Sequence, residues 1–240
     1  MDGGIPIRDQ GPDELRELIA DFQQRTTAHE RMWAWQVEER LGKEPMLEVL
    51  DEVSPRWRDI RKKRLEKILG EGPVDLGVLP RDKLVELLEG IAINWLAQDG
   101  VWFQGVEFKH GMALAKECND ACWAEFSPFE AMSIRFLLGI SDEPGLGGLK
   151  TALGYRLYAV INEQSIHDDG EDAFVFRMDR CRVQTARKRK GLDDYPCKSG
   201  GIVEYTTFAR TIDPRIRTEC IACPPDEHPE DWFCAWRFVL

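Results

Sequence analysis

Four cysteines near the C-terminus have the residue type and spacing of a metal site: Cys197, then Cys220 and Cys223 with two residues between them, then Cys234. Two thiolates spaced Cys-x2-Cys can reach one ion from a tight turn, and four can close a tetrahedral shell around Zn²⁺. A closed shell leaves no position for water, so a structural site is favoured over a catalytic one. An iron–sulfur cluster, buried free thiols and redox pairing stay open as alternatives.

Other side chains could do chemistry of different kinds. Glu107 and His110 stand three residues apart and could exchange protons, while Cys181 is a spare thiol that could act as a nucleophile. Ordinary surface and core roles are the alternatives for all three. Asp226 and His228 lie in the turn before the last cysteine and could replace one thiolate.

A set of aromatic residues in the middle of the chain is the best candidate for a ligand pocket, because small-molecule sites are mostly apolar with few polar groups. An ordinary core would show the same pattern. His29 lies on the apolar face of a predicted helix, as a core residue or a ligand contact. The candidate pocket residues are Trp95, Trp102, Phe103, Phe136 and Tyr155.

The cysteines are positioned by elements that the C-terminal pattern predicts. Alternating or helical spacing predicts a strand at 173–178, a helix at 199–211, and strands at 215–223 and 232–239. Cys197 then precedes the helix, and the last two strands form a Cys-rich hairpin. Cross-strand neighbours approach within about 5 Å, which would bring Cys220 and Cys234 together.

The part of the chain before His167 has mainly helical periodicity. Ser54 and Ser127 are predicted helix caps before prolines, and Asp99-Gly100 is a predicted turn before short strands or an apolar loop at 101–108. The predicted helices span residues 13–41, 54–69, 83–97, 112–125, 128–138 and 149–164.

These elements predict an α+β fold, in which a helical N-terminal two-thirds packs on a small antiparallel sheet. Residues 1–12 are expected to be a flexible N-terminus. Residues 13–240 are expected to form a single α+β domain, with 13–166 mainly helical and 167–240 carrying the sheet and the metal site.

The composition excludes some classes of function. A formal net charge of −11 argues against a general polyanion binder, so no nucleic-acid partner is expected. No secretory signal and no transmembrane segment is visible, which predicts a cytoplasmic protein without a membrane partner. Seven cysteines in a reducing compartment favour metal or free thiols over disulfides. The basic run Arg187 to Lys190 leaves a homodimer or anion contact open.

The C-terminal segment contains, in order, Cys197-Lys-Ser-Gly-Gly201, a predicted helix, Glu219-Cys220-Ile-Ala-Cys223 and Cys234-x-Trp-x-Phe238. This order resembles the zinc segment of the 4-vinyl-reductase-type domain, which includes small-molecule-sensing domains of bacterial regulators. The resemblance implies that Cys197, Cys223 and Cys234 are zinc ligands beside a buried apolar pocket. Cys220 departs from the family pattern, since it stands where the family has a glutamate.

A second resemblance involves Asp99-Gly100-Val-Trp102, Pro196-Cys197-Lys, Ile212-Asp213-Pro-Arg215 and Cys223-Pro-Pro-Asp226. These motifs are similar to those of bacterial cytosolic proteins related to 2-aminothiazoline-4-carboxylate hydrolase. The first expectation is therefore a non-enzymatic, zinc-stabilised protein that binds a small apolar molecule or acts as an accessory. The alternatives are a hydrolase of a small cyclic amidine or amide, using Cys181 or Glu107 with His110, and an iron–sulfur redox protein.

Overall fold

A computed structural model describes residues 7–189, 191 and 193–240. The chain divides into two compact units, one ending at Phe126 and the other beginning at Ser127. The predicted α+β class is confirmed: helices occupy the N-terminal part and an antiparallel sheet the C-terminal part. The prediction of one domain over 13–240 stays a prediction. Of the expected flexible segment 1–12, residues 1–6 lie outside the described residues, whereas a short 3-10 helix (Ile7–Asp9) precedes the first α-helix.

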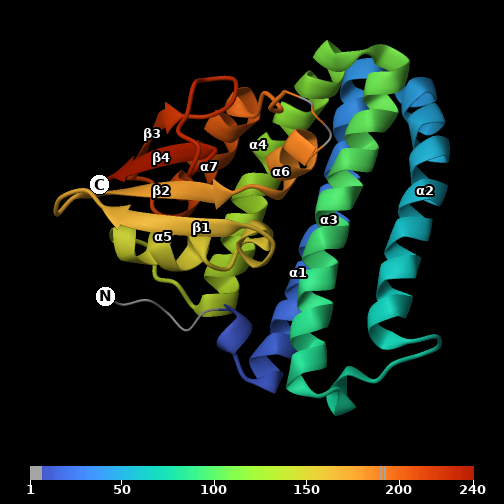
Figure 1. Cartoon of the computed structure of the whole chain (residues 1–240), viewed down its shortest axis with the longest axis horizontal. Coiled ribbons are helices and arrows are strands. Elements are labelled where there is room, and N and C mark those ends of the chain that lie inside the picture. The colour runs from blue at the N-terminus through green and yellow to red at the C-terminus, as the bar shows by residue number, and fades with distance from the viewer. Residues whose placement is uncertain (1–6, 190, 192) are drawn as a thin grey trace. The chain divides into compact units, whose positions relative to one another are not determined.

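Long helices form the first unit. Helices α1 (Pro12–Leu41) and α2 (Lys43–Leu69) are separated at Gly42, and α3 (Arg81–His110) packs against both (Figure 1). A 3-10 helix (Leu76–Val78) lies in the connection from α2 to α3. Gly42 has φ = 88°, a left-handed conformation that ends α1 without a steric penalty because glycine has no Cβ.

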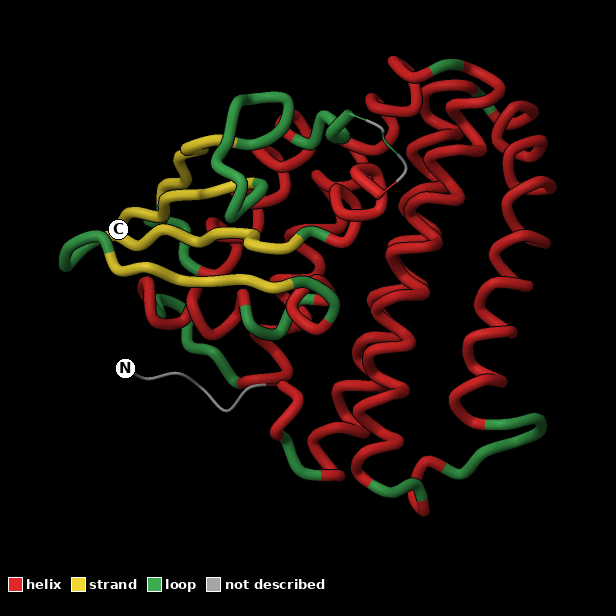
Figure 2. The backbone as a smooth tube through the Cα atoms, in the orientation of Figure 1, coloured by secondary structure: helices red, strands yellow, loops and turns green. Residues whose placement is uncertain are grey.

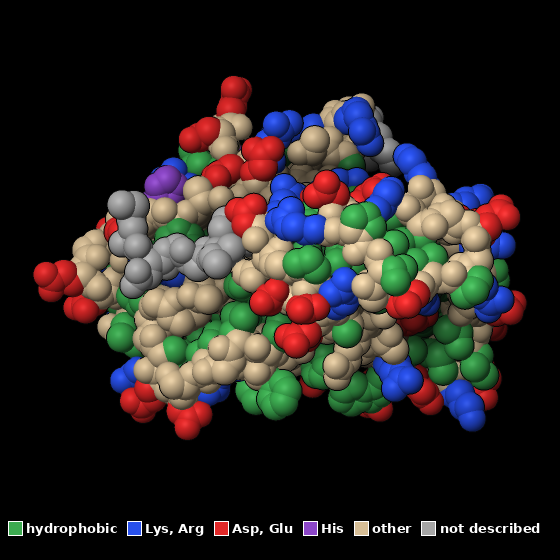
Figure 3. Space-filling view, turned by 90° about the horizontal axis from the view of Figure 1, so that it is seen from below, with side chains coloured by type: hydrophobic (Ala, Val, Ile, Leu, Met, Phe, Trp, Pro, Cys, Tyr) green, Lys and Arg blue, Asp and Glu red, His purple; other side chains and the backbone are tan. Residues whose placement is uncertain are grey.

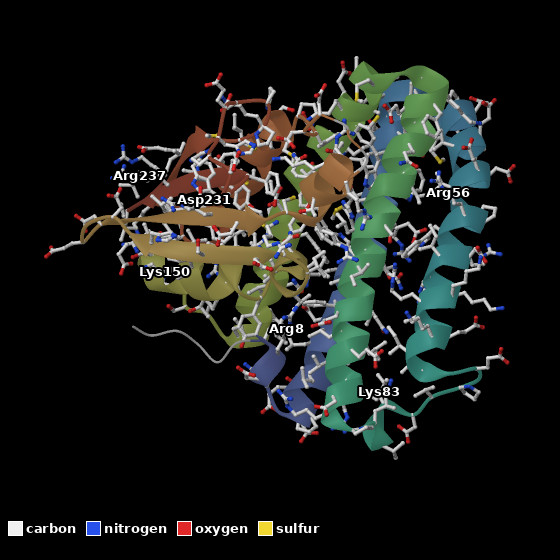
Figure 4. The ribbon with its side chains drawn as sticks, viewed as in Figure 1. Arg8, Arg56, Lys83, Lys150, Asp231 and Arg237 are labelled. Carbon is white, nitrogen blue, oxygen red and sulfur yellow. The ribbon has the colours of Figure 1, made fainter. Side chains whose placement is uncertain are left out.

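Two glycines of α3 let α2 approach closely. A Cβ on Gly90 would lie 2.4 Å from Ile68 Cδ1, and one on Gly105 would lie 2.7 Å from Val53 Cγ2. The same interface has a polar edge, where Arg56 of α2 donates to Gln104 Oε1 of α3 at 2.6 Å (Figure 4). Arg64 of α2 also donates to Asn94 of α3, and Lys109 of α3 pairs with Glu52 of α2, so close apolar packing and polar contacts both join the two helices.

Two of the predicted helix boundaries in this unit were wrong. Ser54 does not cap a helix, because α2 begins at Lys43 and continues through Pro55. Asp99-Gly100 does not form a turn, because α3 runs through it to His110, so the region predicted as strands or loop is helical. In both helices a continuous buried face outweighs the local helix-breaking signal, which is Pro55 in α2 and Asp99-Gly100 in α3. The buried face of α2 includes Val49, Val53 and Trp57.

Two further boundaries were also wrong. Helix α4 spans Met112–Leu138 without a break, and the Ser127 hydroxyl donates to the Glu204 carbonyl oxygen at 2.6 Å instead of capping a helix. The helix predicted for 149–164 is three elements. Helix α5 (Gly145–Leu153) ends before the 3-10 helix η3 (Leu157–Val160), and strand β1 (Glu163–Asp168) follows. Strand β1 is extended because it pairs with the next strand over its whole length.

The second unit contains a four-stranded antiparallel sheet of order β1-β2-β4-β3 (Figure 2). The other strands are β2 (Ala173–Arg180), β3 (Arg217–Ala222) and β4 (Cys234–Val239), close to their predicted bounds. Helix α6 (Arg182–Arg189) follows β2, and helix α7 (Lys198–Ile212) precedes β3. One sheet face carries Phe174, Phe176, Trp236 and Phe238, which form a core with α7.

Candidate functional site

The four C-terminal cysteines lie around one edge of the core of the second unit. Cys197 is the residue immediately before α7, Cys220 is on β3, Cys223 follows β3, and Cys234 begins β4. Cys220 lies opposite Trp236 in the strand register, and Cys234 lies two residues before Trp236 on the same strand. Both cysteines are therefore on the sheet face that packs against α7. All four contact the same hydrophobic cluster, and Cys223 is buried within it.

Side-chain hydrogen bonds hold the loop that carries Cys197. The buried Gln184 of α6 donates to the Tyr195 carbonyl oxygen and accepts from the Tyr195 N–H, both at 2.8 Å. Its Nε2 also lies 3.3 Å from Cys197 Sγ. This amide therefore fixes the thiol at the start of α7, in the way that outer-shell hydrogen bonds orient metal ligands.

A second set of contacts fixes Cys223. The Lys198 N–H donates to the Pro224 carbonyl oxygen at 2.9 Å, which ties the start of α7 to the turn after β3. The Lys198 ammonium lies 2.8 Å from Asp226 Oδ2, and that carboxylate accepts from the Cys223 N–H at 3.3 Å. Gly201 allows the close packing here, because a Cβ would lie 2.7 Å from Trp236 Cζ2 and 3.6 Å from Cys223 Sγ.

The four thiols interact with one another through Cys223. A hydrogen bond with the Cys234 thiol raises the pKa of Cys223, and burial and the thiolate charges of Cys234, Cys197 and Cys220 raise it further. Within residues 7–189, 191 and 193–240, no group of three or more His, Cys, Asp or Glu side chains already has the arrangement of a metal site. The thiols would therefore have to draw closer together around an ion, from positions that are already clustered.

The two turn residues considered as replacement ligands are engaged elsewhere. The ring nitrogens of His228 lie 3.1 Å from Asp194 Oδ2 and 2.8 Å from the Pro229 carbonyl oxygen. Asp226 is paired with Lys198. These contacts favour the cysteines as the candidate ligands.

The two alternative catalytic candidates, Cys181 and the pair Glu107 with His110, lie in different units. Glu107 and His110 are partly buried in the last turn of α3, in the first unit. Cys181 follows β2 in the second unit. Burial raises the pKa of the Cys181 thiol to about 11, so it is protonated at neutral pH and is a poor nucleophile as it stands.

The aromatic residues predicted to line a pocket divide between the units. Trp95, Trp102 and Phe103 are buried on α3 in the first unit. Phe136 and Tyr155 belong to the second unit, where Phe136 is 92% exposed and Tyr155 is partly buried. An exposed Phe136 lines no pocket within its own unit.

A polar cluster in the core of the first unit was only half visible from the sequence. His29 of α1 is fully buried, as expected for the apolar face of that helix. Its ring Nε2 lies 3.7 Å from Oδ1 of Asp99, which was assigned to a turn but belongs to α3. Nothing in the local pattern indicates this contact, since 70 residues separate the two side chains.

The second unit also buries a group of three charged side chains. Arg156 Nε lies 2.8 Å from Glu130 Oε2, and its guanidinium lies 2.6 Å from Glu204 Oε1. Burial lowers the pKa of Arg156, but the charges of Glu130 and Glu204 outweigh it and the net pKa is raised. The arginine also lies 4.7 Å from the centre of the Phe208 ring, so it joins α4, α7 and the segment after α5.

Replacing Arg156 by methionine should destabilise the protein by about 3–5 kcal/mol at pH 7, because two buried carboxylates would lose their cation. Urea unfolding of the variant and of the wild type at pH 7 measures this loss. A loss below about 1 kcal/mol would show that the two carboxylates do not depend on the charge of Arg156.

On the face drawn in Figure 3, Lys and Arg side chains are interspersed with Asp and Glu and form no continuous basic area. Among the described residues, no helix combines the length and the apolar character needed to cross a membrane.

Comparison with known proteins gives one finding. A protein-family model described as "Family of unknown function (DUF6125)" matches residues 77–240, which include all four candidate cysteines and Asp99. No curated protein and no solved structure matches the chain. The match begins after α1 and α2, so His29 lies outside it.

Proposed function

Because this chain belongs to the DUF6125 family, whose function is unknown, we propose its role from its own side chains. The chain is a non-enzymatic protein whose C-terminal sheet is stabilised by a metal ion bound to Cys197, Cys220, Cys223 and Cys234. Its helical unit binds a small molecule. One observation carries the metal part: the thiols at the start of α7, on β3 and on β4 pack against the same hydrophobic cluster as the buried thiol of Cys223, and a hydrogen bond with Cys234, burial and the charges of all three raise its pKa.

Zn²⁺ is the ion that four thiolates in a closed shell suit best, and there it would cross-link α7 to the terminal hairpin. Such a site has no open position for substrate, which agrees with a structural role. The chain's own residues orient the thiols: Gln184 at Cys197, and Asp226 with Lys198 at Cys223. An iron–sulfur cluster would use the same thiols.

Metal analysis of protein purified anaerobically and without chelators tests this part. We expect about one zinc ion per chain, a colourless solution, and loss of the zinc in Cys223→Ser. Cys118→Ser is the control, because Cys118 is a buried thiol of the other unit and should leave the zinc content unchanged. Iron together with visible absorbance would show that the thiols hold an iron–sulfur cluster instead of zinc. The absence of both metals would refute the metal part.

The ligand part is supported by the core of the helical unit, where Trp95 and Trp102 are fully buried beside polar side chains. Native mass spectrometry of the freshly isolated protein should reveal an added mass that denaturing conditions remove. The hydrolase alternative is less well supported, since Cys181 is protonated at neutral pH. Conversion of thiazoline or cyclic amide substrates by the wild type, but not by Cys181→Ala, would reinstate it.

A further inference from the structure

The core of the first unit contains an imidazole without hydrogen-bond partners. The His29 ring is fully buried, and its centre lies 5.7 Å from Trp95, 5.7 Å from Trp123 and 4.3 Å from Phe126. Among the described residues, neither ring nitrogen has a hydrogen-bond partner. Burial lowers the pKa of His29 to about 3, so the ring is neutral at physiological pH. A polar group buried without partners is costly and calls for an explanation.

Asp99 places a negative charge beside this neutral ring. Its Oδ1 accepts from Trp33 Nε1 at 2.9 Å and from Asn119 Nδ2 at 3.4 Å. Burial raises the pKa of Asp99 to about 6, against weaker opposing effects of the Trp33 hydrogen bond and the Lys116 charge. At pH 7 most of the population is therefore ionised. The ion-pair contact of this carboxylate among the described residues is with the neutral His29, and the charge of Lys116 also acts on it.

The surrounding groups favour a cation over an anion or a metal ion. The aromatic faces of Trp95, Trp123 and Phe126 carry negative electrostatic potential, which attracts positive charge. Gln98 adds a buried carbonyl oxygen, Oε1, that accepts no hydrogen bond from the described residues. An anion would be repelled by Asp99. The charge of Asp99 also acts on Cys122, but among the described residues no group of three or more His, Cys, Asp or Glu is arranged to hold a metal ion.

The carboxylate can be reached from solvent although the imidazole cannot. The Asp99 side chain is 18% exposed, whereas that of His29 has no exposed area. A ligand can therefore meet the charge of Asp99 first and place its apolar part against the rings. The free-energy cost of withdrawing the carboxylate from water is offset when a positive charge binds beside it.

We propose that Asp99, with His29 and the aromatic rings around it, forms a binding site for a small organic ammonium cation. This rests on the ligand-binding part of the proposed function and names its ligand class; it does not depend on the metal. The cationic head would pair with Asp99 and face the rings, and the neutral His29 and the Gln98 oxygen would accept hydrogen bonds from an N–H or O–H of the ligand.

Choline and its uncharged isostere 3,3-dimethylbutan-1-ol test this by calorimetric titration of the full chain. The two molecules have the same shape and differ in charge. We expect choline to bind at least tenfold more tightly than the alcohol, and Asp99→Asn to weaken choline binding at least tenfold. The control is Asp82→Asn, a neutralised carboxylate on the same helix whose side chain is 97% exposed, which should bind choline as the wild type does.

Three results would overturn the inference: no binding of choline, equal binding of choline and the alcohol, or unchanged choline affinity in Asp99→Asn. Equal binding of both would keep a small-molecule site and exclude only the cation. If Asp99→Asn does not fold, the wild type decides, because choline affinity should fall as the pH drops below about 6, where Asp99 is protonated. The zinc content is measured separately, so failure here leaves the metal part unaffected.

Discussion

Removal of the metal ion with a strong chelator should lower the unfolding temperature of the wild-type protein by about 10 °C or more. Metal binding to a site that exists only in the folded state adds its free energy to folding. A loss of about 4 kcal/mol shifts the unfolding temperature of a domain of this size by roughly 8–16 °C. The effect is large because the ion would join the start of α7 to β3 and β4.

Single variants show whether the chelator acts through the four thiols. Cys223→Ser should unfold at the temperature of the chelated wild type and should not respond further to chelator. Cys118→Ser should keep the full chelator response, whatever its own stability. A wild type indifferent to chelator, or a Cys223→Ser protein that still responds, would contradict the assignment of these ligands.

The second large effect concerns the pH dependence of stability, where Asp99 and His29 act in opposite directions. The folded-state pKa of Asp99 is raised to about 6, so the folded protein binds the additional proton there and stability falls as the pH rises from about 4 to 6. The folded-state pKa of His29 is lowered to about 3, so the unfolded chain binds the additional proton and stability rises over the same range. In the wild type these contributions should partly cancel.

Replacing one member of the pair should reveal the slope of the other. Asp99→Asn should become more stable from pH 4 to 6, by up to about 1.4 kcal/mol per pH unit, and His29→Gln should become less stable by a smaller amount, because solvent reaches Asp99. Burial raises the pKa of the neighbouring Cys122 well above its ordinary value, so that thiol does not titrate in this range. Urea unfolding at half-unit pH steps measures the slopes. Equal slopes in both variants would refute the pKa directions.

The Asn variant also separates a ligand-binding role of Asp99 from a structural one. An asparagine oxygen can still accept a hydrogen bond from Trp33 Nε1, and the partly buried negative charge is removed. Without ligand at pH 7, Asp99→Asn should therefore be at least as stable as the wild type, as is common when a binding residue is replaced. A loss of several kcal/mol would show that the charge itself stabilises the fold.

The C-terminal elements could be predicted because their patterns are local. The alternation in β4 and the helical spacing in α7 match the buried face of each element. The sequence therefore predicts the approximate bounds of these elements and the element beside which each cysteine lies. The continuation of helices through Pro55, Asp99-Gly100 and Ser127-Pro128 could not be predicted in this way. At each position the residues before and after the helix-breaking signal belong to one continuous helix. Packing partners distant in sequence leave no local signal.

The same limit applies to the candidate sites. Cysteine spacing indicated the thiol cluster, but the Gln184 amide that holds Cys197 comes from α6, where no sequence pattern marks it. The sequence places His29 on an apolar face and predicts a turn at Asp99, so it gives no indication of their contact. A buried carboxylate can be recognised only when the helix facing it is known.

X-ray absorption at the zinc edge of the anaerobically purified protein tests the central claim most directly. A site made by Cys197, Cys220, Cys223 and Cys234 predicts a first shell of four sulfur atoms at about 2.3 Å, with no nitrogen or oxygen neighbour. That shell should be absent in Cys223→Ser. No zinc in the wild type, or zinc surrounded by nitrogen and oxygen, would contradict a thiolate-bound ion in this protein.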